Sequence, residues 1–146
     1  MGASDHFEGL ARAYRMAPIT RSQGTDIVIR DGTAEVRLPV REELLHAASA
    51  VHGSIYFRLL DDAAFFAANS RIEDVIVLTV TFSVQFFRPI REGEMLARGR
   101  VTHASGRLVH CDSELLDGEG QVAATGRGTF VRSSIPLTSL PGYDLP

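Results

Sequence analysis

The sequence predicts an α+β protein in which one antiparallel β-sheet wraps around one long buried helix. Three observations lead to this prediction. Residues 54–69 are apolar on almost every side, residues 78–86 alternate between apolar and polar side chains, and the connections between the later strand candidates are short. A helix that is apolar all round is buried on most sides, and period-two alternation is typical of a strand. Short connections imply antiparallel neighbours, because a parallel crossover needs a dozen or more residues.

The first part of the chain predicts a short helix followed by a hairpin. Apolar residues recur at helical spacing over residues 5–16, and Pro18 predicts the end of this helix. Two apolar runs, residues 27–29 and 34–38, flank the dipeptide Asp31-Gly32. This dipeptide is a strong hairpin signal because glycine tolerates the positive φ that the turn needs.

The long helix over residues 54–69 follows a short helical turn and a loop at residues 41–51. Ser54, or the residue just before it, is expected to cap the start of this helix with an oxygen atom. The expected polar positions of the helix are Arg58, Asp61, Asp62 and Asn69.

Four strands are predicted after the helix, at residues 78–86, 95–103, 108–116 and 121–132. Two prolines within residues 135–146 and a third at the end predict a loose tail. We therefore divide the chain into an N-terminal helical segment (residues 1–24), a central domain (25–134) and a C-terminal tail (135–146).

Composition excludes several classes of function. The chain has 146 residues and a formal net charge of −3, so it lacks the basic excess of a nucleic-acid-binding domain. All 15 basic residues are arginines, which excludes Schiff-base chemistry on lysine and the lysine of a phosphate-binding loop. The single cysteine, Cys111, excludes an intrachain disulfide framework and a multi-cysteine zinc site.

No apolar run approaches the roughly 20 residues that a membrane-spanning helix needs. The first twenty residues contain Asp5 and Glu8 and lack the apolar stretch of a secretory signal. We therefore expect a cytoplasmic protein that contacts neither membrane nor nucleic acid.

The informative stretch for chemistry is His52-Gly53-Ser54 at the start of the long helix. The free N–H groups of a first helical turn point outward, and the helix dipole favours negative charge there. Such a helix start can bind the oxyanion that forms when a thioester or ester is attacked. Asp61 lies nearly two turns further on the same helix, where a carboxylate can orient a water or attack directly. The alternative is a capped helix start and a solvated carboxylate, both of which are common.

The run from His52 to Ser70 resembles the hotdog-fold acyl-CoA thioesterases of the phenylacetate-degradation (PaaI-like) type. In that family, an HGG entrance to the central helix is followed by an Asp nine residues after the His, as Asp61 follows His52 here. The Asn69-Ser70 pair at the helix end and the run Phe86-Phe87-Arg88-Pro89 also resemble the family. The resemblance covers roughly residues 25–132 and implies a hotdog domain.

The resemblance implies hydrolysis of an acyl-CoA thioester without a cofactor, since CoA is part of the substrate. Asp61 corresponds to the catalytic carboxylate, as general base or nucleophile, and Gly53 to the glycine whose N–H polarises the carbonyl. His52 corresponds to a motif residue that is usually structural. Some members use an Asn where this chain has His46, and a Ser contributed across the dimer where this chain has Thr79. A homodimer, often paired into a tetramer, is implied.

Two departures from the family pattern affect the expected substrate range. Ser54 replaces the second glycine of HGG and can narrow the approach or supply a hydroxyl group to the substrate. His46 replaces the Asn of the family. If His46 contacts the thioester or the attacking water, its protonation will alter the rate of hydrolysis. The alternative is that His46 ends the helical turn over residues 41–46. Arg88 is the arginine that we select to bind the CoA phosphates, with Arg91, Arg107 and Arg127 as alternatives.

A second interpretation is a hotdog protein that binds an acyl-CoA or another acyl ligand without hydrolysing it. Other polar residues have simpler roles. Asp62 is four residues after Arg58, which favours an ion pair, and Cys111 alternates with apolar residues, which favours a place in the core. His103 and His110 are expected to be exposed strand residues, and no metal is expected.

Overall fold

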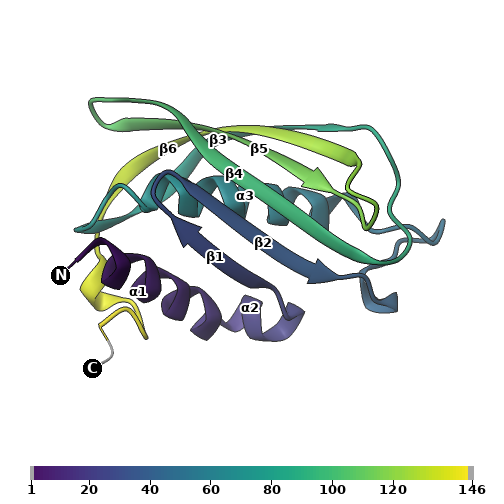
Figure 1. The fold of residues 1–146 in the computed structure, drawn as a ribbon, viewed down its shortest axis with the longest axis horizontal. Helices are drawn as coiled ribbons and strands as arrows, with labels where there is room; N and C mark the ends of the chain where they lie inside the picture. The colour runs from purple at the N-terminus through teal and green to yellow at the C-terminus, as the bar shows by residue number, and fades with distance from the viewer. Residues whose placement is uncertain (1, 145–146) are drawn as a thin grey trace.

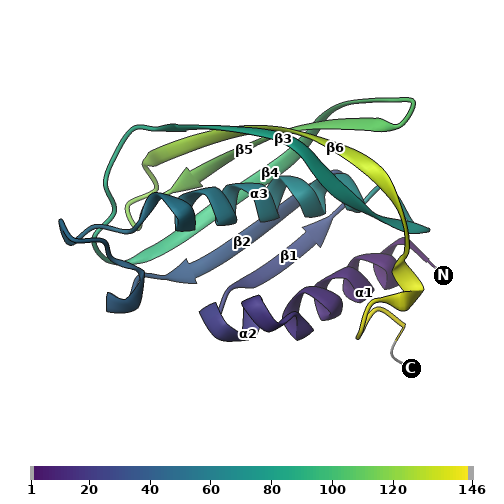
Figure 2. The same ribbon diagram turned by 180° about the vertical axis from the view of Figure 1, so that it is seen from behind.

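The computed structural model describes residues 2–144, and it contains one antiparallel sheet with a long helix on one face (Figures 1 and 2). The six strands lie in the order β1-β2-β4-β5-β6-β3. Their bounds are Asp26–Arg30 (β1), Thr33–Pro39 (β2), Val75–Phe86 (β3), Glu94–Ser105 (β4), Leu108–Leu116 (β5) and Val122–Pro136 (β6). The predicted α+β class and antiparallel sheet are confirmed.

The predicted hairpin at Asp31-Gly32 joins β1 to β2. Arg30 pairs with Thr33 across the turn, and Gly32 has a φ of 72°, which is the conformation that favours glycine. Strand β1 pairs with β2 along its whole length without a register shift. The short 3₁₀ turn that was expected after β2 lies at Glu42–Leu44.

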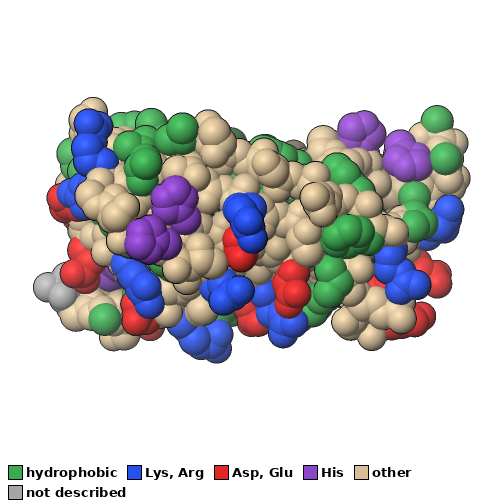
Figure 3. Space-filling view, turned by 90° about the horizontal axis from the view of Figure 1, so that it is seen from above, with side chains coloured by type: hydrophobic (Ala, Val, Ile, Leu, Met, Phe, Trp, Pro, Cys, Tyr) green, Lys and Arg blue, Asp and Glu red, His purple; other side chains and the backbone are tan. Residues whose placement is uncertain are grey.

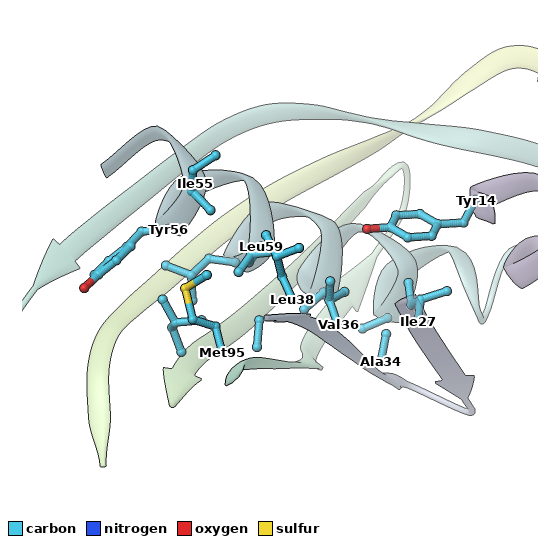
Figure 4. Close-up of a cluster of buried hydrophobic side chains, with 14 of the residues drawn as sticks. Tyr14, Ile27, Ala34, Val36, Leu38, Ile55, Tyr56, Leu59 and Met95 are labelled. Atoms are coloured by element: carbon cyan, nitrogen blue, oxygen red, sulfur yellow. The ribbon is translucent and has the colours of Figure 1, made fainter. Parts of the chain in front are cut away.

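The long helix, α3, spans Gly53–Asn69 and packs against the sheet closely enough to exclude side chains at one contact. A Cβ built on Gly99 of β4 would overlap the carbonyl oxygen of Ala63. Small residues on both elements therefore set the distance between helix and sheet. The core between them includes Val36, Leu38, Leu59 and Met95, none of which is exposed (Figure 4).

Two side chains of α3 differ from the sequence expectation. Asn69 was expected to reach solvent, but it is fully buried. Its side chain accepts a hydrogen bond from the Val77 N–H at 2.8 Å and donates to two backbone carbonyls, so it joins the helix end to β3. Phe57, in contrast, is 42% exposed on the side of the helix that faces β3. Asn69 can be buried because the hydrogen bonds of its side chain are satisfied.

Strand β3 lies at the edge of the sheet and pairs only with β6. It begins at Val75, three residues before the predicted start at residue 78. Several apolar side chains on or just after this edge strand are exposed: Leu78 (47%), Val80 (55%), Phe86 (56%) and Phe87 (57%). An unpaired strand edge with exposed apolar residues is a surface on which another strand can pair.

The N-terminal segment forms two helices, α1 (Ala3–Met16) and α2 (Pro18–Gln23). Pro18 ends α1 as predicted, but it also occupies the first turn of α2, which the sequence interpretation missed. Proline is tolerated at that position because the first N–H groups of a helix have no intrahelical acceptor. Helix α1 packs against β1 (Figure 2). In the described part of the chain, no helix has the length and apolarity required to cross a membrane.

The expectation of a loose tail at residues 135–146 is wrong for the residues that the structure describes. Leu137 is fully buried and Tyr143 is 2% exposed. The Tyr143 hydroxyl lies 2.7 Å from Nδ1 of His6, and the Arg12 guanidinium donates to the carbonyl oxygens of Gly142 and Tyr143. Strand β6 continues to Pro136, and a 3₁₀ turn follows at Leu137–Ser139. Apolar burial and these hydrogen bonds attach the segment to α1.

Candidate functional site

Helix α3 begins at the His52-Gly53-Ser54 motif, and His52 is its N-cap. The imidazole Nδ1 of His52 accepts a hydrogen bond from the Ser54 N–H at 3.0 Å, and the Ser54 hydroxyl lies 2.8 Å from the same nitrogen. The prediction that Ser54 or the residue just before it caps the helix is therefore wrong. A ring nitrogen with a free lone pair can replace the usual oxygen acceptor.

Replacing His52 with Ala is expected to lower the free energy of unfolding by about 1 kcal/mol, the usual effect of losing an N-cap acceptor. Ser54→Ala is the matched control, because it keeps the capping nitrogen and the donor N–H. Urea denaturation of both variants measures the difference. Equal stability of His52→Ala and the unchanged protein would contradict the capping role.

Gly53 is the first residue of α3, and its N–H donates no hydrogen bond within residues 2–144. The N–H belongs to the first turn, where the helix dipole attracts negative charge. The ring of Phe86 lies beside it, since a Cβ built on Gly53 would be 3.4 Å from Phe86 Cε1. The Gly53 amide can therefore stabilise an oxyanion next to an apolar wall.

Asp61 is half-buried on α3 and accepts a hydrogen bond from the Thr79 hydroxyl at 3.0 Å. Burial raises the pKa of the Asp61 carboxyl, and the Thr79 hydrogen bond partly opposes this shift. A carboxylate with a raised pKa is a stronger base toward a bound water. The structure thus brings Asp61 and Thr79, two of the site residues predicted from the sequence, into direct contact.

The Thr79 contact corrects one expectation. Thr79 was expected to approach the Asp61 of the other subunit, but it contacts the Asp61 of its own chain. The reason is that β3 runs antiparallel to α3 within one chain. Phe86 lies beside Gly53, Phe82 packs on Phe57 with ring centroids 5.4 Å apart, and Thr79 meets Asp61.

Gly53 and Asp61 are too far apart in one chain to act on the same carbonyl group. They are separated by eight residues of continuous helix, which corresponds to about 12 Å along the axis. A hydrogen bond to an oxyanion and a hydrogen bond to the attacking water each span about 3 Å. One chain therefore holds two parts of a site, at two places along α3.

Asp62 forms the predicted ion pair with Arg58, with Oδ2 3.3 Å from Nε. The sequence interpretation missed a second partner of Asp62, since the Tyr14 hydroxyl of α1 donates to the same oxygen at 2.8 Å. Burial raises the pKa of Asp62 to about 6 despite the charge of Arg58. Asp62 thus points away from Asp61, toward α1, and joins the two helices.

This raised pKa predicts a pH-dependent contribution to stability. Between pH 4 and 6 the folded protein holds a proton on Asp62 that the unfolded chain releases, so the free energy of unfolding falls as the pH rises. The shift from 3.8 to about 6 corresponds to about 3 kcal/mol over this interval. Asp62→Asn lacks this contribution, so its stability relative to the unchanged protein should rise by that amount between pH 4 and 6 in urea denaturation. A constant difference would contradict the assignment.

His46 lies in the loop between the 3₁₀ turn and α3. Its Nδ1 accepts a hydrogen bond from the Ala48 N–H at 3.0 Å, and its ring centroid is 6.4 Å from that of His52. The helical turn ends at Leu44. The alternative interpretation, in which His46 ends this turn, is therefore wrong. His46 is therefore close to the start of α3, and its role in the reaction stays a prediction.

Arg88 follows β3 on the same side of the molecule as the start of α3. Its guanidinium contacts the Gln121 side chain, and its carbonyl oxygen accepts a hydrogen bond from the Tyr56 hydroxyl at 2.7 Å. Arg127 instead pairs with Asp112 on the sheet. Positive and negative side chains are mixed on the face that Figure 3 shows. A contact between Arg88 and phosphate stays a prediction.

Cys111 has the predicted place in the core, and His103 is exposed as expected, but His110 is only partly exposed. Cys111 is fully buried, and burial raises the pKa of its thiol to about 12. His103 and His110 face each other on paired strands with ring centroids 5.9 Å apart. Among residues 2–144, no group of three or more His, Cys, Asp or Glu side chains is arranged to hold a metal ion.

Comparison with known proteins identifies the family of the chain. The thioesterase superfamily matches residues 48–124, a range that contains the start of α3, Asp61 and Thr79. The acyl-coenzyme A thioesterase PaaI of Escherichia coli is 27% identical over 127 residues, which cover 86% of this chain and 89% of that protein.

Solved structures show the same fold. The structure of the E. coli PaaI protein from the phenylacetic acid degradation operon superposes with a TM-score of 0.83 at 22% identity, covering 92% of this chain and 97% of that one. A conserved protein of Pseudomonas aeruginosa superposes with a TM-score of 0.77 at 29% identity, covering 84% and 99%. The fold is the hotdog fold, and the chain belongs to the thioesterase superfamily.

Proposed function

We propose that the protein hydrolyses an acyl-CoA thioester to a free acid and CoA. The observation that carries the proposal is the half-buried Asp61 carboxylate, hydrogen-bonded to Thr79, in a chain whose helix start presents the free Gly53 N–H. Asp61 acts as the general base toward water or as the nucleophile. The thioester carbon gains an oxygen, the C–S bond breaks, and CoA leaves as the thiol after taking up a proton. The reaction needs no cofactor.

We propose further that the active site forms between two subunits. Asp61 and Thr79 of one chain are too distant from their own Gly53, so the partner's Gly53 supplies the oxyanion donor. Two copies of α3 that lie antiparallel, with the two β3 edges paired, bring these groups together and cross near Phe57, the midpoint between residues 53 and 61. The exposed side chains of Phe57, Leu78 and Val80 support this arrangement, because dimerisation covers them.

The other residues have supporting roles in this proposal. His46 and Ser54 flank the start of α3 and face the thioester from the partner's side, and Arg88 contacts the CoA phosphates. His52 keeps the helix start in place through its cap. Pairing of dimers into a tetramer and a cytoplasmic location stay predictions from the sequence.

A thiol-release assay on a panel of acyl-CoA thioesters tests the proposal. We expect turnover of at least one thioester, with a rate that rises with pH as Asp61 loses its proton. Light scattering at micromolar concentration should give at least the mass of a dimer. Acyl-CoA binding without thiol release would favour the alternative, a binding protein, and an active monomer would contradict the shared site.

A further inference from the structure

An apolar pocket of about 380 Å³ lies beside the C-terminal half of α3. Most of the lining residues come from three parts of the chain that are distant in sequence: the junction of α1 and α2, helix α3, and the C-terminal segment after β6. Most lining side chains are apolar, among them Ala17, Ile19, Phe65, Ile76 and Leu140. An apolar pocket of this size with a few polar groups is typical of a small-molecule site.

The pocket borders the same stretch of α3 that carries Asp61. Phe65 lies one helical turn after Asp61 on the same face of α3, because residues four apart on a helix are neighbours. Ile76 lies on β3, three residues before Thr79, which donates its hydrogen bond to Asp61. The antiparallel course of α3 and β3 therefore leads from Gly53 and Phe86, through Asp61 and Thr79, to Phe65 and Ile76.

The polar groups of the pocket come from Arg58, Asp62, Tyr14 and Thr20. The Arg58 guanidinium and the Asp62 carboxylate pair with each other, and their side chains are only 11% and 19% exposed. Arg58 also donates hydrogen bonds to the neutral side chains of Gln23 and Thr25, and its charge is compensated by Asp62. A carboxylate entering the pocket would lose its hydration without gaining a counter-ion, because the charge of Arg58 is already neutralised by Asp62.

The wall of the pocket is held in place before any ligand binds. The C-terminal segment is attached to α1 by Tyr143 with His6, and by Arg12 with the carbonyl oxygens of Gly142 and Tyr143. The α1–α2 junction is attached to α3 through Tyr14 and Asp62. A preformed pocket loses little free energy to ordering when a ligand enters.

We propose that this pocket receives the acyl group of the thioester and selects uncharged acyl groups of up to about ten non-hydrogen atoms. The size follows from the volume, because a water-sized group takes about 30 Å³. This proposal rests on the proposed function, since it assumes that the thioester carbonyl lies at Asp61.

Binding to the Asp61→Asn variant tests the pocket without turnover. Calorimetric titration compares CoA, acetyl-CoA, octanoyl-CoA, hexanoyl-CoA and adipyl-CoA. Octanoyl-CoA should bind at least about 100-fold more tightly than acetyl-CoA, because each buried methylene contributes about tenfold or more. Adipyl-CoA, which ends in a carboxylate, should bind at least about tenfold more weakly than hexanoyl-CoA, because its carboxylate would lose hydration in an apolar pocket without gaining a counter-ion. Equal affinities along either comparison would overturn the proposal.

A variant that fills the pocket locates the acyl group within it. Ala17→Phe should lower the affinity for octanoyl-CoA at least about tenfold and change that for acetyl-CoA less than about twofold. Ala104→Phe, on the exposed end of β4, is the matched control and should change neither. An unchanged octanoyl-CoA affinity in Ala17→Phe would place the acyl group elsewhere. If Ala17→Phe does not fold, the chain-length series still decides whether an apolar acyl site exists.

The outcomes separate the two proposals. Binding that depends on acyl length, together with no thiol release by the unchanged protein, would contradict hydrolysis and leave the pocket assignment standing. Thiol release with no dependence on acyl length in binding would contradict the pocket assignment alone.

Discussion

Replacing Asp61 with Asn is expected to lower kcat for the best acyl-CoA by about 10²–10⁴, the usual effect of losing a general base. The amide has nearly the shape of the carboxylate and can still accept the hydrogen bond from Thr79, so the fold should be retained. Because the Asp61 carboxyl is half-buried, removing its charge should not lower the free energy of unfolding. The measurement is kcat from thiol release, with circular dichroism and thermal unfolding of the same samples.

Asp31→Asn is the matched control for this prediction. Asp31 lies in the exposed turn between β1 and β2 and pairs only with Arg71, so its replacement should leave kcat unchanged. The pH profile gives a second test. Since burial raises the pKa of Asp61, the unchanged protein should lose activity as the pH falls through that pKa. Near-normal hydrolysis by Asp61→Asn would show that another group activates the water.

Replacing Gly53 with Pro is expected to lower kcat by about 10²–10³, the effect of losing one donor of an oxyanion hole. Proline removes the N–H and little else, because it is well tolerated at the first position of a helix. His52 already has φ −63° and ψ 141°, the extended conformation that a residue before proline prefers. The helix should therefore form normally, and thiol release measures the loss.

Gly53→Ala is the control, because it keeps the N–H and adds a methyl group that meets Phe86 at ordinary contact distance, 3.4 Å. It should retain most of the activity. Equal activity of Gly53→Pro and Gly53→Ala would show that this N–H does not contact the thioester.

Mixing the two inactive proteins tests whether the site is shared. In a heterodimer of Gly53→Pro and Asp61→Asn chains, one of the two sites combines an intact Asp61 with an intact Gly53 from the other chain. Unfolding and refolding an equimolar mixture should therefore restore about a quarter of the normal activity, given random pairing of symmetric dimers. A site contained within one chain would stay inactive after mixing, because each chain has one defect.

The local parts of this molecule could be predicted from the sequence, because they depend on neighbours along the chain. The turn at Asp31-Gly32, the central helix and the alternation over residues 78–86 depend on backbone conformation and residue periodicity. The helix start and Asp61 could be recognised as candidates for the same reason, since their spacing is a property of one helix. The Arg58–Asp62 pair also depends only on helical spacing.

Contacts between distant segments were decided by the tertiary structure. Asn69 looks like a surface residue in the sequence, yet β3 supplies the backbone partners that allow its burial. The sequence after residue 135 predicts a loose tail, yet Leu137 and Tyr143 are buried and Tyr143 forms a hydrogen bond with His6 of α1. His52, Tyr14 and the pocket wall were assigned wrongly or missed, because their partners follow from packing.

The position of Thr79 shows the physical reason most clearly. The resemblance placed Thr79 across the dimer, near the Asp61 of the other subunit, whereas the two side chains meet within one chain. Whether they meet within one chain or between two depends on the direction in which β3 runs past α3, and hence on the order of strands in the sheet. The amino-acid sequence by itself determined which groups are available for chemistry, and the tertiary structure decided which of them one chain can bring together, because the distances between separated segments are set by packing and not by spacing along the chain.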